Sequence, residues 1–192
     1  MPRVIAGLFK GLSLSVPDDP LTRPTAGLVR EALFSILGRR TQGAAVLDLF
    51  AGSGAMGLEA LSRGAAKVLL CDESPKVISA ISANVSKIPL GLRPQARILR
   101  ASFPREYGAL AAHGPFSLFL LDPPYRAPLG DVLSFLALAA GNGLACPGAT
   151  LVWEQDPRSL KLWDHEAQAP WRVTLSRSWG KRAAAILELG GE

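Results

Sequence analysis

An apolar strand that runs into a glycine-rich turn occupies residues 46–57, which read Val46-Leu47-Asp48-Leu49-Phe50-Ala51-Gly52-Ser53-Gly54-Ala55-Met56-Gly57. The turn leads into a helix that we expect to begin near Leu58. The three glycines fit the pattern G-x-G-x-x-G, and Asp72 stands twenty residues after Gly52, at the end of the next apolar run. Glycines let backbone N–H groups approach a ligand closely, and an acid at a strand tip can accept hydrogen bonds from ribose hydroxyls. This combination predicts a nucleotide-type site.

The same alternation of strand and helix continues along the chain. Apolar runs occur at 45–50, 67–71, 96–99, 116–121 and 149–153, and helix-compatible segments separate them. Runs at this spacing indicate βαβ units, in which helices cover both faces of a parallel sheet. Two further strands, near 171–178 and 183–189, are joined by Trp179-Gly180-Lys181-Arg182, which favours an antiparallel hairpin that closes the sheet. The predicted fold class is therefore α/β.

Asp48 helps to distinguish between two ligands that both contain a ribose, a dinucleotide and S-adenosylmethionine. A dinucleotide places a pyrophosphate over the glycine-rich turn, whereas the methionine tail of S-adenosylmethionine carries an ammonium group. Asp48 lies four residues before Gly52 on the strand. Its carboxylate suits the ammonium group and would repel a pyrophosphate. The alternative is that Asp48 is a helix N-cap or a structural hydrogen-bond acceptor.

A second motif, Asp122-Pro123-Pro124-Tyr125, follows the apolar run at 116–121. That run does not alternate with polar residues, which is typical of a strand buried on both faces. Two consecutive prolines lack N–H donors and hold the preceding residue extended, so Asp122 and the Pro123 carbonyl remain acceptors at a rigid tip. A planar conjugated amine matches this tip, with its N–H groups on the acceptors and its ring stacked on Tyr125. The alternative is a plain loop, because Asp and Pro are common in turns.

The composition indicates one globular domain. The 192 residues suffice for one sizeable core, and 48% of them are hydrophobic and 19% charged. The sequence contains no apolar run long enough for a membrane span or a signal peptide, so we expect a cytoplasmic protein without a membrane partner. Cys71 and Cys146 lack the spacing of a metal site, and we expect free buried thiols and no bound metal.

The net charge of +5 is concentrated at the two ends of the chain. Residues 1–43 hold six Lys+Arg against three Asp+Glu, and residues 158–192 hold six against four. Basic ends on a neutral body fit a polyanion such as nucleic acid, although an ordinary solvated surface explains so modest an excess almost as well. Residues 3–16 predict a small hairpin or extended arm, and Thr25 is a plausible N-cap for a helix with one apolar stripe that ends at Gly38.

Together these motifs resemble a class I S-adenosylmethionine-dependent methyltransferase with the D/N-P-P-Y/F motif of amino-group methylation. More closely, the sequence resembles the bacterial family that methylates the exocyclic N2 amine of a guanine in 16S ribosomal RNA. The matching segments are Arg23-Pro24-Thr25, Val29-Arg30-Glu31, Leu33-Phe34, Leu47-Asp48-Leu49-Phe50-Ala51-Gly52-Ser53-Gly54, Gly57-Leu58-Glu59-Ala60-Leu61-Ser62-Arg63-Gly64 and Asp122-Pro123-Pro124-Tyr125.

The resemblance implies a Rossmann-like, seven-stranded, mostly parallel sheet with a C-terminal antiparallel hairpin and a small N-terminal arm. It divides the chain into an RNA-facing arm and helix at 1–43 and an S-adenosylmethionine-dependent methyltransferase domain at 44–192. We expect a monomer that acts on 16S ribosomal RNA in a small-subunit particle. The implied catalytic residues are Asp122, Pro123, Pro124 and Tyr125. The implied cofactor-binding residues are Asp48, Phe50, Ala51, Gly52, Ser53, Gly54, Asp72 and Ser102. The implied RNA-binding residues are Arg23, Thr25 and Arg30.

One segment departs from the family pattern. Such enzymes usually place an acidic residue near the adenine amine after the third strand, but this chain has Arg100-Ala101-Ser102-Phe103 there. We therefore expect Ser102 or the backbone to make the adenine contact, and we expect Glu73 to be solvated.

Other activities explain less of the sequence. Methylation of adenine N6 or of a glutamine side chain usually requires an additional domain larger than the 43 leading residues. A nicotinamide-dependent oxidoreductase accounts only for the glycine pattern and would need a catalytic Lys or His near a strand end. A non-catalytic RNA-binding module would have no use for Asp122-Pro123-Pro124-Tyr125.

Overall fold

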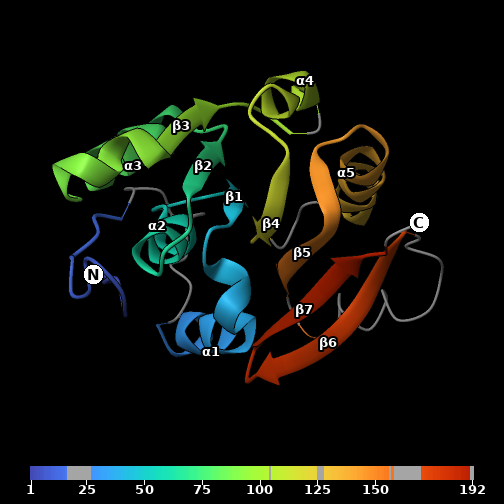
Figure 1. Ribbon diagram of the computed structural model, residues 1–192, viewed down its shortest axis with the longest axis horizontal. Coiled ribbons are helices and arrows are strands. Elements are labelled where there is room, and N and C mark those ends of the chain that lie inside the picture. The colour runs from blue at the N-terminus through green and yellow to red at the C-terminus, as the bar shows by residue number, and fades with distance from the viewer. Residues whose placement is uncertain (17–26, 104, 125–127, 156, 158–169, 191–192) are drawn as a thin grey trace.

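A single mixed sheet organises the structure, a computed structural model that describes residues 1–16, 27–103, 105–124, 128–155, 157 and 170–190. In this part of the chain seven strands lie in the order β3-β2-β1-β4-β5-β7-β6 (Figure 1). Neighbouring strands from β3 to β5 are parallel, and β7 is antiparallel to both β5 and β6. The predicted α/β class, the mostly parallel sheet and the C-terminal hairpin are confirmed.

The elements follow the predicted alternation. The strands are β1 (Ala45–Leu49), β2 (Lys67–Asp72), β3 (Ala96–Arg100), β4 (Phe116–Leu121), β5 (Ala145–Gln155), β6 (Trp171–Trp179) and β7 (Arg182–Leu189). The helices are α1 (Gly27–Leu37), α2 (Ala55–Ser62), α3 (Pro75–Val85), α4 (Tyr107–Ala111) and α5 (Leu129–Gly141), with 3₁₀ helices η1 (Gly38–Thr41) and η2 (Leu90–Gln95).

Two element boundaries differ from the prediction by more than two residues. Helix α2 begins at Ala55 and not near Leu58, because Gly54, with a φ of 75°, turns the chain directly into the helix. Strand β5 begins at Ala145, before the predicted 149–153, because Ala145 pairs with Phe116 ahead of an irregularity in the β4–β5 register.

The register brings the carboxyl ends of the central strands to one edge of the sheet. Leu121 pairs with Leu49 on β1 and with Trp153 on β5. Asp122 therefore follows β4 at the level of Glu154 on β5. Open parallel sheets bind their ligands at this edge, so the two sequence motifs meet where a site is expected.

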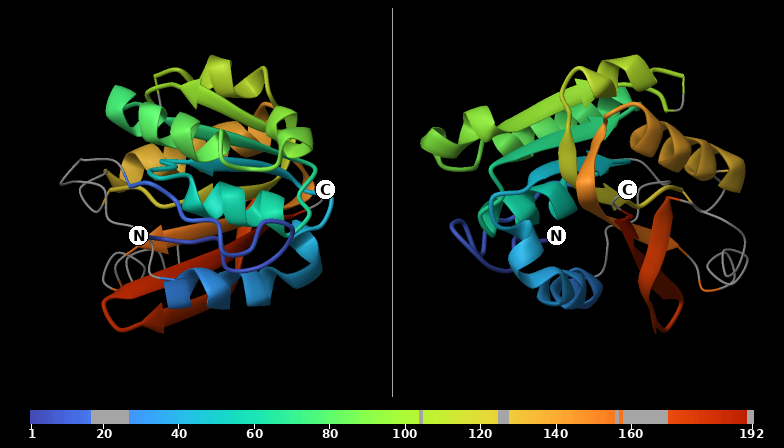
Figure 2. Two further views of the ribbon diagram at one scale, coloured as in Figure 1. Left: turned by 90° about the vertical axis from the view of Figure 1, so that its left-hand side faces the viewer. Right: turned by 45° about the vertical axis from the view of Figure 1, so that its right-hand side comes forward.

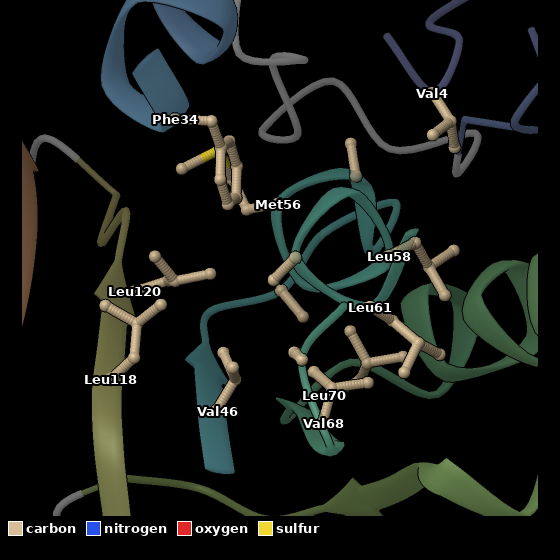
Figure 3. Close-up of a cluster of buried hydrophobic side chains, with 14 of the residues drawn as sticks. Val4, Phe34, Val46, Met56, Leu58, Leu61, Val68, Leu70, Leu118 and Leu120 are labelled. Carbon is tan, nitrogen blue, oxygen red and sulfur yellow. The ribbon is translucent and has the colours of Figure 1, made fainter. Parts of the chain in front are cut away.

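Helices cover both faces of the sheet (Figure 2). One buried cluster joins the sheet to α1, α2, α3 and the N-terminal arm, and a second joins the opposite face to α4 and α5. Figure 3 shows part of the first cluster. It contains Leu118 and Leu120 of β4 together with Leu58 and Leu61 of α2. Phe34 of α1 belongs to this cluster as well. Helix α1 thus shares the core of the sheet.

The N-terminal arm, residues 1–16, forms the small hairpin that the sequence predicts. Arg3 and Ser13 form an antiparallel bridge, and the Val4 N–H donates to the Leu12 carbonyl (3.0 Å). The turn of the arm lies on α2, where the Leu8 N–H donates to the Ser62 carbonyl (2.7 Å). A Cβ atom on Gly7 would lie 1.8 Å from that carbonyl oxygen, so only glycine permits this approach.

Both cysteines are free, as predicted. Cys71, at the end of β2, is buried, but Cys146, at the start of β5, is only partly buried. Burial raises the pKa of the Cys71 thiol to about 12. Among the described residues, no group of three His, Cys, Asp or Glu side chains is placed to hold a metal ion. No helix in the described ranges is long and apolar enough to cross a membrane.

Candidate active site

The glycine-rich turn uses the backbone conformations that its sequence permits. Gly52 and Gly54 have φ angles of 55° and 75°, and Phe50 has a φ of 66°. The left-handed region is open to glycine but costs a bulky residue free energy, so Phe50 is a local outlier of the kind that clusters at functional sites. The Ala51 N–H donates to the Cys71 carbonyl (3.0 Å), which fixes the turn against the end of β2.

Gly57 lets α2 approach the sheet closely. A Cβ atom there would lie 2.6 Å from Leu70 Cδ2, 2.8 Å from Val68 Cγ2 and 2.9 Å from Asp48 Oδ2. The absence of that atom allows the Gly57 N–H to donate to Asp48 Oδ2 (2.7 Å). The third glycine of the pattern therefore positions the carboxylate of Asp48.

Asp48 lies on β1, just before the glycine-rich turn, and is buried, with 3% of its surface exposed. Burial raises its pKa well above the ordinary value, the Gly57 hydrogen bond opposes that rise, and the negative charges of Asp122 and Asp72 add to it. Asp48 does accept a structural hydrogen bond, which was one alternative for this residue. The same carboxylate is in a place where a ligand's positive charge would be strongly favoured.

Asp72 joins the glycine-rich turn to the start of α3. Its Oδ2 accepts a hydrogen bond from the Gly52 N–H (3.2 Å), and its Oδ1 accepts one from the Ser74 N–H (3.0 Å). Burial raises the pKa of Asp72, and the bonds from Ser74 and Gly52 oppose the rise. The predicted ribose-binding acid thus stands directly beside the turn.

A small pocket at the carboxyl edge contains the predicted amine-binding residue. The pocket is lined by four apolar residues, Met56, Leu120, Leu121 and Val152, and by three acidic residues, Asp48, Asp122 and Glu154. Asp122 is half-buried, Pro123 buried and Pro124 exposed, so the tip passes from the core to the surface. Tyr125 lies outside the described residues.

Glu154 is a site residue that the sequence analysis missed. It has 2% of its surface exposed, and its Oε1 accepts a hydrogen bond from Arg182 Nη1. The available signal was its position, because Glu154 follows an apolar run at the same edge as Asp122.

Ser102, the expected adenine contact, lies two residues after the end of β3. The Ser102 N–H donates to Glu106 Oε2 (2.6 Å), and the Ser102 hydroxyl donates to Glu73 Oε2 (2.9 Å). Two carboxylates therefore contact Ser102. Glu73 is exposed, as expected, but it also accepts this hydrogen bond. Glu106 stands four residues after Ser102, and this spacing is the signal that the sequence offered.

Arg30 corrects one of the RNA-binding expectations. Its side chain is 2% exposed and its Nε lies 3.6 Å from Glu59 Oε2. Arg30 Nη2 also donates to the Arg3 carbonyl of the arm. A buried guanidinium in these contacts cannot reach an RNA phosphate, so Arg30 is a structural cation between α1, α2 and the arm. Arg23 and Thr25 lie outside the described residues.

Comparison with known proteins supports the reading of these motifs. Residues 2–187 match the family described as "Conserved hypothetical protein 95". The chain is 40% identical over 128 residues to the ribosomal RNA small subunit methyltransferase D of Escherichia coli K12, covering 66% of this chain and 62% of that protein. It therefore spans less than two thirds of that relative.

Two further matches cover more of the matched protein's own length. The ribosomal RNA small subunit methyltransferase D of Haemophilus influenzae is 31% identical over 154 residues, which cover 80% of this chain and 78% of that protein. The solved structure of yhhF from Escherichia coli has a TM-score of 0.82 and 30% identity, over 99% of this chain and 98% of that one. The chain therefore belongs to the Conserved hypothetical protein 95 family and is a relative of the ribosomal RNA small subunit methyltransferases D.

Proposed function

We propose that this protein transfers a methyl group from S-adenosylmethionine to the exocyclic N2 amine of a guanine in 16S ribosomal RNA. The observation that carries this proposal is the grouping of carboxylates around a glycine-rich turn. Asp48 is buried within electrostatic range of Asp122 and Asp72, and both raise its pKa. The relatives named as ribosomal RNA methyltransferases supply the class of substrate.

The residues of the turn fit S-adenosylmethionine. This cofactor carries two positive groups, an ammonium and a sulfonium, and its sulfonium supplies an electrophilic methyl group when it is bound. Asp48 would hold the ammonium group, because an opposite charge offsets the penalty of keeping that carboxylate buried. Asp72 would accept from the ribose hydroxyls, and Ser102 with its two neighbouring carboxylates would lie toward the adenine.

The same charges argue against a dinucleotide. A pyrophosphate over the turn would add negative charge next to Asp48, whose pKa is already raised by Asp122 and Asp72. We therefore favour a cationic ligand over a nicotinamide dinucleotide.

The target amine would lie at the tip of β4. A guanine amine is a weak nucleophile, because its lone pair is delocalised into the ring. The Asp122 carboxylate and the Pro123 carbonyl would accept its two hydrogens and favour the pyramidal nitrogen of the transition state. Positioning is the main requirement of an in-line displacement, in which the reacting atoms are held about 3 Å apart. The nitrogen of the product is acidic after methylation, and its proton would pass to Asp122 or to water. Tyr125 would fix the plane of the base.

We further propose that the substrate is presented in a small-subunit particle in the cytoplasm and that the enzyme acts as a monomer. Residues 1–43 would face the RNA, and residues 44–192 would carry the cofactor and the transfer chemistry. Because Arg30 is buried, we expect only Arg23 and Thr25 to contact RNA among the three residues named for that segment.

Two measurements test this proposal. Titration calorimetry with S-adenosylmethionine and with the nicotinamide dinucleotides should show binding of the first alone. Transfer of a tritiated methyl group to unmodified small-subunit particles, followed by mapping of the modified base, should yield N2-methylguanine. An Asp122→Asn variant should lose transfer by at least about 100-fold and keep its cofactor affinity, as expected for a residue needed chiefly in the transition state. Normal turnover of that variant would overturn the role given to Asp122.

A further inference from the structure

The tip of the β6–β7 hairpin is a basic surface at the active-site edge. Residues 171–182 contain four Arg or Lys and no Asp or Glu. Strand β6 is an edge strand of the sheet (Figure 1). Residues 172–178 are exposed. Basic residues on an edge strand can serve merely to prevent pairing with another sheet. That explanation does not account for the location of the tip.

The register locates the tip beside the pocket. Leu121 of β4 pairs with Trp153, Trp153 with Ala185, and Ala185 with Ser176 of β6. Three strand spacings put Ser176 at about 14 Å from Leu121. Because β6 is antiparallel to β7, which is itself antiparallel to β5, β6 runs toward the same edge as β4. Arg177 therefore follows this row by one residue, and Lys181 lies farther along, in the hairpin turn; both are on the side of Asp122.

The tip is held firmly in this place. Trp179 packs against the buried cluster on the α1 face, and the Arg177 guanidinium lies over its ring at 5.8 Å from the centroid. Arg182 donates to Glu154, which itself lines the pocket. The hairpin is thus tied to the wall of the candidate site through a buried carboxylate.

Arg177 and Lys181 present their charge to solvent. Both are exposed, and among the described residues neither takes part in a salt bridge. A rigid tip with two such cations and an aromatic ring is complementary to a phosphate backbone. The tip is separated from the amine site by three strand spacings or more, which corresponds to nucleotides that flank a target base and not to the target base itself.

We propose that Arg177 and Lys181 bind RNA phosphates that flank the methylated guanine. This inference rests on the proposed function and names a second contact with the same substrate. Exposed Val173 and Leu175 on the same strand would suit a protein partner instead. The absence of acidic residues favours RNA, because a protein partner does not require a purely basic surface.

The test compares two double variants that remove the same charge. Arg177→Gln with Lys181→Gln alters the tip, whereas Lys67→Gln with Arg97→Gln alters exposed cations at the opposite edge, at the starts of β2 and β3. Fluorescence anisotropy measures binding to unmodified small-subunit particles between about 50 and 200 mM salt. Each phosphate contact on a single strand contributes about 0.7 to the slope of log K against log salt. The loss of two contacts should therefore reduce the magnitude of the slope by about 1.4.

The control pair should keep the wild-type slope. Both double variants should keep the wild-type affinity for S-adenosylhomocysteine and the wild-type melting temperature, because all four side chains are exposed. Equal slopes for the tip variant and the wild type would overturn the proposal. A Val173→Ser, Leu175→Ser variant tests the exposed apolar pair on the same strand. Weaker binding by that variant together with an unchanged slope for the tip variant would likewise overturn the proposal. Failure of the wild-type protein to transfer a methyl group would count against the proposed function, and the slope comparison would still decide the role of the tip.

Discussion

The side chain of Asn84 donates a hydrogen bond to the backbone carbonyl of Ser53 (2.9 Å), in the middle of the glycine-rich turn. The same amide nitrogen donates to the Ser15 carbonyl (2.9 Å), and the amide oxygen accepts from the Ser15 N–H (2.7 Å). Asn84 is fully buried on α3. One side chain therefore joins the end of the N-terminal arm to the turn that we assign to the cofactor.

Asn84→Asp should loosen both of these segments. A carboxylate cannot donate, so the carbonyls of Ser15 and Ser53 would lose their donor and face a negative charge. We expect a lower melting temperature and about a tenfold weaker affinity for S-adenosylhomocysteine, equivalent to about 1.4 kcal/mol. Titration calorimetry and thermal denaturation measure these effects.

Lys87→Gln is the matched control for that variant. Lys87 contacts Ser13, Ser15 and Asn84 but not the turn, so its loss should affect the arm alone. We expect the cofactor affinity of Lys87→Gln to equal that of the wild type. Equal losses in both variants would show that Asn84 acts only through general stability.

Gly57→Ala should destabilise the protein by about 1–3 kcal/mol, because its Cβ would overlap Leu70, Val68 and Asp48. The displacement of Asp48 should also weaken cofactor binding. Gly130→Ala, in α5, is the control, because a Cβ there has no neighbour within 4 Å. Chemical denaturation should show the loss for Gly57→Ala only, and equal stability of the two variants would contradict the close-packing role.

Asp48→Asn should separate stability from binding. The pKa of Asp48 in the folded protein is raised, so its contribution to stability is present below the unfolded pKa and is lost as the pH rises through the folded pKa. At neutral pH the buried carboxylate is therefore unfavourable in the absence of a ligand. The amide oxygen of Asn can still accept from Gly57, so the variant should match or exceed the wild-type melting temperature at pH 7.

Cofactor affinity should change in the opposite direction. Loss of a hydrogen bond to a charged group costs about 1.5–3 kcal/mol, or roughly 10- to 150-fold in Kd. Calorimetry with S-adenosylhomocysteine measures it. Unchanged affinity would remove Asp48 from the proposed ammonium site, and a large fall in melting temperature would show that its charge is structural.

Arg30→Ala should act on stability and not on RNA phosphates. Removing one partner of a buried ion pair costs about 3 kcal/mol, although Glu59 keeps Arg63 as a second partner. The salt slope of RNA binding by the folded variant should equal that of the wild type. A reduced slope at unchanged melting temperature would restore Arg30 as an RNA contact.

Local patterns were sufficient to predict most of the sheet. Strands such as β1 and β4 are continuous apolar runs, and the glycine pattern of residues 52–57 requires a tight turn. Long-range pairs were not visible in this way. Arg30 meets Glu59 across 29 residues, and Glu154 meets Arg182 across 28, so neither partner can be chosen from sequence spacing. The contact of Arg30 with Glu59 and that of Glu154 with Arg182 were not predicted for this reason.

The unequal environments of the two cysteines offer a practical use. Thiolates and not thiols react with maleimides, and a thiol with a pKa of about 12 provides almost no thiolate at neutral pH. Cys71 should therefore stay unlabelled while the partly exposed Cys146 accepts a fluorophore. Cys146 lies at the amino-terminal end of β5, away from the carboxyl edge, so a dye there could report on the arrival of a large RNA particle without obstructing the pocket.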